Sequence, residues 1–269
     1  MNPTTVPLPP IDLVMHPEWQ LWLTIFFGIT GLASWVYGVR IAIKEKSIVP
    51  LLVIAGGSIA VLGESLIDIV GLCYWTEQGQ WTLYEAFGRK IPYITLGSYT
   101  TFFGGIVLYT LRQFEQGAPA KTLYISFICW MCIEWAWEPI PIHYGVWSYY
   151  GAQPFRVLDF PLWWPPVNTV GAFSAAFLIW KVKKYLSGLS LLAILPLVFS
   201  GDLMGNALVA WPLWITLNMD VGYEVTVPAG FLTLILCYLS LKIMVRLVTE
   251  ERCLDTERSE HNPVAGAVV

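Results

Sequence analysis

Long apolar runs separated by polar connections dominate the chain, and seven of them can be distinguished. A helix needs about 20 predominantly apolar residues to cross the hydrocarbon core of a bilayer. The pattern therefore predicts an all-α fold, a polytopic bundle of seven transmembrane helices that forms a single domain over residues 1–248. The seven runs are Trp19–Ile43, Ile48–Cys73, Tyr93–Leu111, Thr122–Trp137, Val167–Lys184, Leu189–Leu217 and Thr226–Val248.

Two of the connections, residues 74–92 and 139–166, are long and rich in aromatic residues, Gly and Pro. Long loops in a compact protein are usually functional or disordered, and these two are too aromatic for disorder. We expect both to fold as lids over the outer mouth of the bundle. The tail, residues 249–269, is charged and then rich in small residues, so we expect a disordered cytoplasmic segment.

Basic residues fall mainly on one side of the predicted bundle. Of the 15 Lys and Arg residues, 12 lie in or beside connections on one side, and only Arg89, Lys90 and Arg156 lie on the other. Cytoplasmic loops carry the excess of Lys and Arg in membrane proteins. This asymmetry requires an odd number of spans. It predicts an outer N-terminus and a cytoplasmic C-terminus, in a multi-pass protein of a bacterial plasma membrane.

The composition favours a membrane location and excludes one class of partner. Only 13% of the residues are charged, whereas a soluble domain usually contains about 25%. The net charge of −4 and the dispersed basic residues argue against nucleic-acid binding. The expected partners are membrane lipid and a lipophilic small molecule. The sequence does not determine the oligomeric state, and an oligomer is possible.

Acidic residues recur inside the predicted spans, where ionisable groups are costly and normally face the bundle interior. Three spans each carry a pair of polar residues four positions apart, a spacing that places both on one helix face. The pairs are Glu64 and Asp68, Glu134 and Glu138, and Asp202 and Asn206. The alternatives are structural, because Glu138 precedes Pro139 and suits an interfacial position, and Asp68 suits a hydrogen bond between helices.

The depth of these acids suggests one shared pocket. With a rise of about 1.5 Å per residue, Glu64 lies roughly 24 Å from the inner end of its span, and Glu134 and Asp202 roughly 20 Å from theirs. Burial and neighbouring carboxylates disfavour the ionised form of a carboxyl group, so at least one acid is expected to be protonated. A protonated acid beside an ionised one is the arrangement for acid/base catalysis. The catalytic candidates are Glu64, Asp68, Glu134, Glu138 and Asp202.

Aromatic and polar residues near these acids are the candidates for binding a substrate. Aromatic rings suit a lipophilic molecule and stabilise a developing cation. The candidates are Asn206, Asn168, Trp75, Trp81, Glu85, Arg89, Trp137, His143, Trp147 and Trp163. A lone loop histidine is more often incidental, and Glu85 and Arg89 also suit a local ion pair. No HExxH, histidine box or Asp-rich motif is present, so neither a metal nor another cofactor is expected.

Two stretches of the predicted lids carry a resemblance to a known family. The segment Gly79–Pro92 (GQWTLYEAFGRKIP) resembles the first long loop of the AveC-type spirocyclase family of membrane proteins. The segments Tyr144–Gly151 (YGVWSYYG) and Phe160–Asn168 (FPLWWPPVN) are similar to that family as well. The resemblance covers roughly residues 60–210. It implies a cofactor-free cyclase that forms a spiroketal from a dihydroxyketone polyketide with loss of water. It assigns no catalytic residues.

Other resemblances and alternatives point to related chemistry. The chain is also similar to membrane carotenoid hydratases and to small membrane-bound terpene cyclases. The shared features are an acid in a span, then a Tyr- and Gly-rich loop, then a Pro-rich start of the next span. All three comparisons imply acid/base chemistry on a lipophilic polyketide or isoprenoid. A proton-coupled transporter is the alternative from another class, because buried acids suit proton coupling equally well. A retinal protein is disfavoured, because its Schiff-base Lys should lie near the middle of the seventh span. Lys242, in that span, lies near the inner interface instead.

Overall fold

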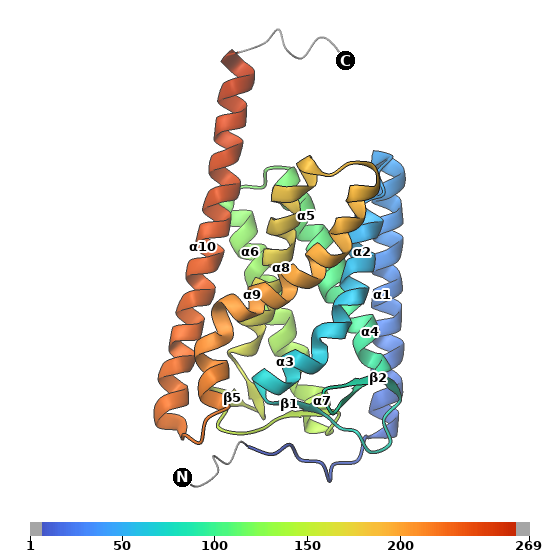
Figure 1. Ribbon diagram of the computed structural model, residues 1–269, viewed down its shortest axis with the longest axis vertical. Helices are drawn as coiled ribbons and strands as arrows, with labels where there is room; N and C mark the ends of the chain where they lie inside the picture. The colour runs from blue at the N-terminus through green and yellow to red at the C-terminus, as the bar shows by residue number, and fades with distance from the viewer. Residues whose placement is uncertain (1–6, 262–269) are drawn as a thin grey trace.

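The computed structural model describes residues 7–261, with side chains described for residues 7–251. The chain is mostly helical, and its long helices run side by side along the long axis of the molecule (Figure 1). One of them crosses the bundle obliquely. The N-terminal segment and the strands lie at one end, and the C-terminal helix extends beyond the other helices at the opposite end (Figure 1).

All seven predicted runs are helical, although three of them consist of more than one element. The elements are α1 (Pro17–Glu45); α2, η1 and α3 (Val49–Ala60, Val61–Gly63, Glu64–Gly71); α4, η2 and α5 (Tyr93–Tyr99, Thr100–Ile106, Val107–Glu115); α6 (Ala120–Trp137); α8 (Trp164–Val182); η4 and α9 (Gly188–Ala193, Ile194–Leu217); and α10 (Tyr223–His261). Short helices α7 (Pro139–His143) and η3 (Lys183–Tyr185) follow α6 and α8. The segment η2 is a π-helix, and η1 is a 3₁₀ turn.

Five helices in the described residues are long and apolar enough to cross a membrane. They are Pro17–Glu45, Val49–Gly71, Tyr93–Glu115, Gly188–Leu217 and Tyr223–Glu251. The two remaining predicted spans, α6 and α8, form helices at the expected positions. Both are shorter and less apolar, because α6 contains Lys121 and Glu134, and α8 contains Pro165, Pro166 and Asn168. The chain is therefore consistent with a membrane protein.

Two expectations from the sequence differ from the structure. The tail expected to be disordered from residue 249 continues α10 as helix to His261, and residues 262–269 lie outside the described part of the chain. The all-α expectation omits three two-stranded antiparallel sheets. They pair β1 (Cys73–Trp75) with β4 (Trp147–Tyr149), β2 (Thr82–Ala86) with β3 (Arg89–Pro92), and β5 (Arg156–Val157) with β6 (Phe160–Pro161).

The β1–β4 pair joins the two lids into one structure at the end of the bundle. The N-terminal segment fastens the first lid, because the Met15 amide donates to the Gln78 carbonyl at 2.8 Å. The Gln20 side chain accepts a hydrogen bond from the Trp81 amide at 2.6 Å and donates to the Gly79 carbonyl at 3.1 Å. The lids therefore form a cap held by backbone and amide hydrogen bonds.

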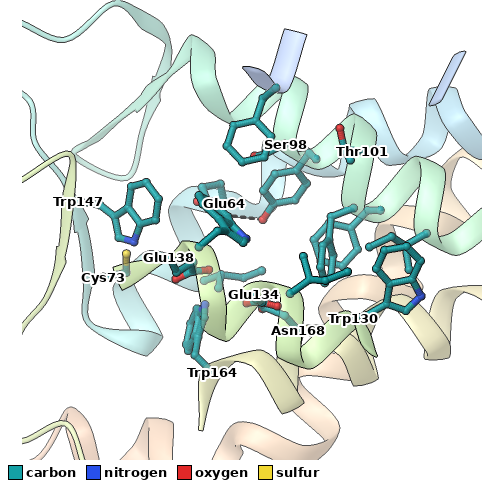
Figure 2. Close-up of a pocket in the computed structure, with 18 of the residues that line it drawn as sticks. Glu64, Cys73, Ser98, Thr101, Trp130, Glu134, Glu138, Trp147, Trp164 and Asn168 are labelled. Atoms are coloured by element: carbon teal, nitrogen blue, oxygen red, sulfur yellow. Dashed lines mark hydrogen bonds between the residues drawn. The ribbon is translucent and has the colours of Figure 1, made fainter. Parts of the chain in front are cut away.

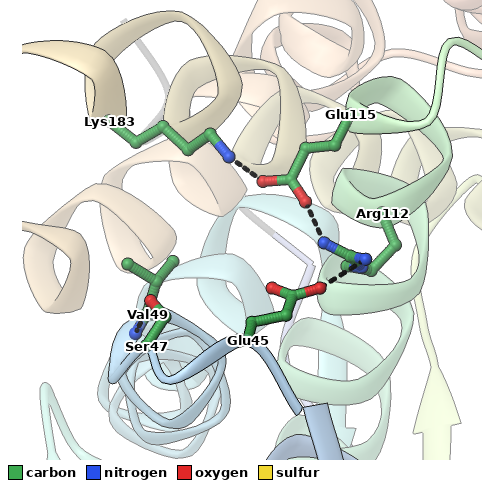
Figure 3. Close-up of polar contacts among 6 residues, drawn as sticks. All are labelled: Glu45, Ser47, Val49, Arg112, Glu115 and Lys183. Atoms are coloured by element: carbon green, nitrogen blue, oxygen red, sulfur yellow. Dashed lines mark hydrogen bonds and ion pairs between the residues drawn. The ribbon is translucent and has the colours of Figure 1, made fainter. Parts of the chain in front are cut away.

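The opposite end of the bundle is held by charges. Arg112 of α5 contacts Glu45 of α1 at 2.5 Å and Glu115 at 2.6 Å, and Glu115 also contacts Lys183 (Figure 3). This chain of alternating charges links α1, α5 and η3. Partly exposed ion pairs contribute modest stability individually, and networks contribute more than isolated pairs.

The close crossing of α2 and η2 depends on glycine. A Cβ atom on Gly57 would lie 2.2 Å from the backbone nitrogen of Gly104, so the two backbones are in direct contact. Small residues allow this approach between membrane helices. The crossing matters for the site, because Glu64 follows α2 along the chain and Tyr99 immediately precedes η2.

Replacement of Gly57 by Ala tests this crossing. The added methyl group has no room, so we expect Gly57→Ala to lower the free energy of unfolding by about 1–3 kcal/mol. The matched control is Gly28→Ala, because a Cβ at Gly28 meets nothing within 4 Å. Thermal unfolding in detergent measures both. Equal stability of the two variants would contradict the contact.

Candidate functional site

Four of the five predicted catalytic acids line one cavity of about 310 Å³ beneath the lids. The acids are Glu64, Asp68, Glu134 and Glu138. Figure 2 shows Glu64 on one side of the cavity and Glu134 and Glu138 on the other. Most of the remaining wall is aromatic or aliphatic. The prediction that helix faces bearing these acids converge is therefore confirmed for two of the three spans.

Glu64 is the first residue of α3, directly after the 3₁₀ turn that interrupts the second span. Its Oε1 accepts a hydrogen bond from Nε1 of Trp75 at 2.8 Å. Its Oε2 accepts one from the hydroxyl of Tyr99 at 2.5 Å. Each oxygen thus has one donor, which suits an ionised carboxylate because that group only accepts hydrogen bonds.

Glu134 and Glu138 form a second carboxyl pair, one turn apart on α6. Oε1 of Glu134 accepts a hydrogen bond from Nδ2 of Asn168 at 2.5 Å, and the Tyr149 hydroxyl donates to Oε2 of Glu138 at 3.2 Å. The other oxygen of Glu134, Oε2, is buried and has no hydrogen-bond partner among the described residues. Two buried carboxylates one helical turn apart disfavour each other's ionised form. We therefore expect the pair to hold one proton between its members.

Asp68 lies one turn beyond Glu64, toward the lids, and is 2% exposed. The Cys73 thiol lies beside it in the same cavity. Burial, and then the charge of Asp68, raise the pKa of the Cys73 thiol well above its usual value. Burial, and then the charge of Glu138, do the same for the pKa of the Tyr149 hydroxyl. Both groups therefore stay protonated at neutral pH, and the Tyr149 hydroxyl acts as a donor to Glu138.

Asp202 corrects the prediction of a pocket shared by three spans. It is fully buried but does not line the cavity. Its Oδ1 accepts a hydrogen bond from Nδ2 of Asn206 at 2.8 Å, and both residues pack against Gly171 of α8. Asn206 is likewise outside the cavity. The helical rotation of α9 turns this pair toward α8, and depth along the span carries no information on that rotation.

The predicted binding residues divide in the same way. Four of them line the cavity: Trp75, Trp137, Trp147 and Asn168. The others lie elsewhere. Trp81, Glu85 and His143 are exposed in the lids, and Trp163 is buried and donates a hydrogen bond to Gln153 at 3.1 Å.

Arg89 lies in the lids, outside the cavity. It forms no salt bridge with Glu85. Its guanidinium group lies over the rings of Tyr74 and Tyr150, 5.4 and 5.8 Å from the ring centroids. It also donates a hydrogen bond to the hydroxyl of Tyr150 at 2.6 Å. The guanidinium acts electrostatically on Asp68. Arg89 is therefore a cation near the outermost acid of the site.

Several cavity residues were not predicted from the sequence. The most important are the hydroxyl donors Tyr99 and Tyr149, together with Cys73. Trp130, Trp164 and several Phe residues complete the wall. One signal was available for Trp130, because it lies one turn before Glu134, on the same helix face. Tyr149 belongs to the quoted loop motif, but nothing in the motif indicates its partner.

Comparisons with known proteins leave the site to be interpreted on its own geometry. No family model matches the chain, and no curated protein or solved structure is similar to it at a significant level. The arrangement itself offers two neighbouring carboxyl groups, which we expect to hold one proton, and one carboxyl group with two hydrogen-bond donors. Among the described residues, no group of three His, Cys, Asp or Glu side chains is placed to hold a metal ion.

The shared proton of Glu134 and Glu138 is directly observable. We expect the infrared spectrum at neutral pH to contain the carbonyl stretch of a protonated carboxyl group from this pair, because two neighbouring buried carboxylates disfavour each other's ionised form. The difference spectrum between the wild type and Glu138→Gln should contain this band. Glu85→Gln, which changes an exposed lid residue, is the control and should leave the band unchanged. A spectrum unaffected by Glu138→Gln would show that the pair does not hold the proton.

Proposed function

We propose that this protein is a cofactor-free intramembrane cyclase that acts by acid/base catalysis on a lipophilic substrate. The observation that carries the proposal is the placement of two neighbouring carboxyl groups, Glu134 and Glu138, and of the doubly hydrogen-bonded Glu64 in the wall of one aromatic cavity. A donor and an acceptor of protons on opposite sides of a bound molecule suit general acid/base catalysis. The resemblance of the lid motifs to spirocyclases favours dehydrative cyclisation.

The first half of such a reaction forms a ring and moves one proton. The proton of the Glu134–Glu138 pair passes to a ketone oxygen while a substrate hydroxyl attacks the carbonyl carbon. Glu64 takes the proton from that hydroxyl as the new C–O bond forms. The product of this half is a cyclic hemiketal, with the proton now on Glu64. The hydrogen bonds from Trp75 and Tyr99 hold the Glu64 carboxylate in place for this transfer.

The second half releases water and restores the starting state. Glu64 returns its proton to the hemiketal hydroxyl, the C–O bond breaks, and one water leaves. The resulting oxocarbenium ion lies among the rings of Trp75, Trp137 and Trp147, whose faces attract a cation. The second substrate hydroxyl attacks this cation, and its proton returns to the Glu134–Glu138 pair. The balance is one spiroketal and one water, with no net change in the protein.

Isoprenoid chemistry is the alternative within the same class. A terpene cyclase or a carotenoid hydratase would use the proton of the Glu134–Glu138 pair to protonate an alkene. The aromatic wall would then stabilise the carbocation. Cyclisation of a polyene leaves its mass unchanged, hydration adds one water, and spiroketal formation removes one. The mass of the product therefore separates the three reactions.

Amide substitutions test the catalytic proposal in proteoliposomes. The substrates are a synthetic long-chain dihydroxyketone and a linear polyprenyl alcohol, followed by mass spectrometry. Loss of a general acid or base should slow turnover about 10²–10⁴-fold, so we expect that loss for Glu64→Gln, Glu134→Gln and Glu138→Gln. Glu85→Gln is the control, because Glu85 is exposed in the lids outside the cavity, and should retain activity. Full activity in all three cavity variants, or conversion of neither substrate by the wild type, would count against the enzyme.

A proton-coupled carrier is a second candidate, favoured by one specific observation. Two runs that line the cavity are interrupted beside it, at the 3₁₀ turn η1 and at the π-helix η2. Interrupted helices beside buried acids are typical of binding sites in secondary transporters. A carrier would release its ligand chemically unchanged inside the vesicles, with proton movement. The product analysis described above distinguishes it from the cyclase.

We further propose seven spans with the N-terminus outside and the C-terminus in the cytoplasm of a bacterial cell. Helix α1 begins and helix α10 ends at opposite ends of the bundle, which supports an odd number of spans (Figure 1). The basic residues Lys44, Arg112 and Lys183 near the end opposite the lids support the orientation.

Cysteine accessibility in intact cells tests this topology. A membrane-impermeant thiol reagent should label Glu85→Cys, because the lid is expected outside, and should not label Lys184→Cys. The background is a variant with the exposed Cys129 and Cys132 replaced by Ser. Labelling of Lys184→Cys but not of Glu85→Cys would reverse the orientation. Labelling at both positions, or at neither, would place the lid and Lys184 on the same side of the membrane. Either result would contradict the proposed topology.

A further inference from the structure

The cavity is elongated and divided by polarity. On α6 its wall extends from Glu138 to Trp130, a distance of about 12 Å at 1.5 Å per residue. The acids occupy the part nearer the lids, and the deeper part is lined by Phe102, Ile106 and Trp130. Figure 2 shows Trp130 set apart from Glu64 and Glu138 along the cavity. This shape suits a long apolar molecule with one polar end.

One side of the cavity is open between helices. Phe26 of α1 and Ile133 of α6 line the cavity, and each is 53% exposed on the outer surface of the bundle. Their helices pack against different neighbours, α1 on α2, α4 and η2, and α6 on α8 and α10. The boundary between α1 and α6 is therefore a place where the cavity reaches the surface that faces lipid.

Two aromatic contacts frame this opening, which we call the window. Toward the lids, Phe27 of α1 contacts Trp137 of α6 edge to face, with ring centroids 5.1 Å apart. Deeper in the bundle, Tyr109 of α5 contacts Trp130 of α6 at 5.9 Å. The two Trp residues are about 10 Å apart along α6 at 1.5 Å per residue, and Ile133 lies between them. The window is thus bounded along α6 by two Trp side chains, with Ile133 between them.

The lid end of the cavity is closed by comparison. The ring of Trp147 lies 4.7 Å from that of Trp75 and 5.7 Å from that of Trp137, and all three rings line the cavity with the acids. The β1–β4 pair lies behind these rings, and the Thr76 amide extends it by donating to the Val146 carbonyl at 3.1 Å. Access from the water side would require this paired structure to separate.

We propose that the ligand is a lipophilic molecule with a terminal hydroxyl or carbonyl group, and that it reaches the acids from the bilayer through the window. Its polar end passes Ile133 to reach Glu134 and Glu138, and its apolar chain occupies the deeper part of the cavity or remains in lipid. The proposal rests on the proposed function only for the chemistry that follows binding. Occupancy of the cavity is measurable without turnover.

Photolabelling in proteoliposomes tests the window. The probe is a long-chain alcohol with a diazirine beside its hydroxyl group, dissolved in the vesicle lipid. Mass spectrometry should find label on the segment that contains Glu134 and Glu138. Ile133→Trp fills the window and should lose most of this label, and Phe26→Trp should act in the same direction from α1. Ile128→Trp is the matched control, because Ile128 is 51% exposed on α6 but does not line the cavity.

A disulfide across the lids distinguishes the two routes of access. Thr76→Cys with Val146→Cys places two thiols at paired positions whose Cα separation in an antiparallel pair, about 5.5 Å, suits a disulfide. Access through the window is supported if the oxidised double-Cys variant is still labelled and Ile133→Trp is not. It is overturned if oxidation abolishes labelling, reductant restores it, and Ile133→Trp is fully labelled. If the protein converts neither substrate but is still labelled through the window, the catalytic proposal is disproved and the proposed route of access stands.

Discussion

The structure depends on the need of buried carboxyl groups for hydrogen-bond partners inside the protein. Water is scarce in the membrane interior, so an acid placed there must find donors on the same chain. Glu64 obtains one from Trp75 in the first lid and one from Tyr99 in the third predicted span. Glu138 obtains one from Tyr149 in the second lid. The same bonds that satisfy the acids therefore hold the lids over the bundle.

Charged residues have different partners at the two ends of the bundle. This difference distinguishes charges with a structural role from charges with a functional one. At the end away from the lids, acids and bases alternate from Glu45 through Arg112 and Glu115 to Lys183, so each charge has an opposite partner. The acids of the cavity have neutral hydrogen-bond donors in place of cations. The nearest cation to act on them, Arg89, is itself held between two tyrosine rings outside the cavity. Acids kept without counter-ions in this way are costly, which points to function.

The interruptions of two helices are part of how the site is built. The 3₁₀ turn η1 ends directly before Glu64, and the π-helix η2 begins directly after Tyr99. A π-segment and a 3₁₀ turn both change the rotation of the helix that follows them. Both interruptions adjoin the hydrogen bond that the Tyr99 hydroxyl donates to the Glu64 carboxyl at 2.5 Å. The direct backbone contact of Gly57 with Gly104 keeps the two interrupted runs together at this point.

Much of this arrangement was determined by the sequence, because hydrophobicity and spacing are local properties. Apolar length located all seven helical runs, and the four-residue spacing placed Glu64 with Asp68 and Glu134 with Glu138 on common faces. Tertiary structure alone decided the rotation of each helix about its axis, which turned Asp202 away from the cavity and Ile133 toward it. It also decided the pairing of the two lids and the donors Tyr99 and Tyr149. These features depend on contacts between residues far apart in the chain, and periodicity along one helix carries no information about which neighbour its face will meet.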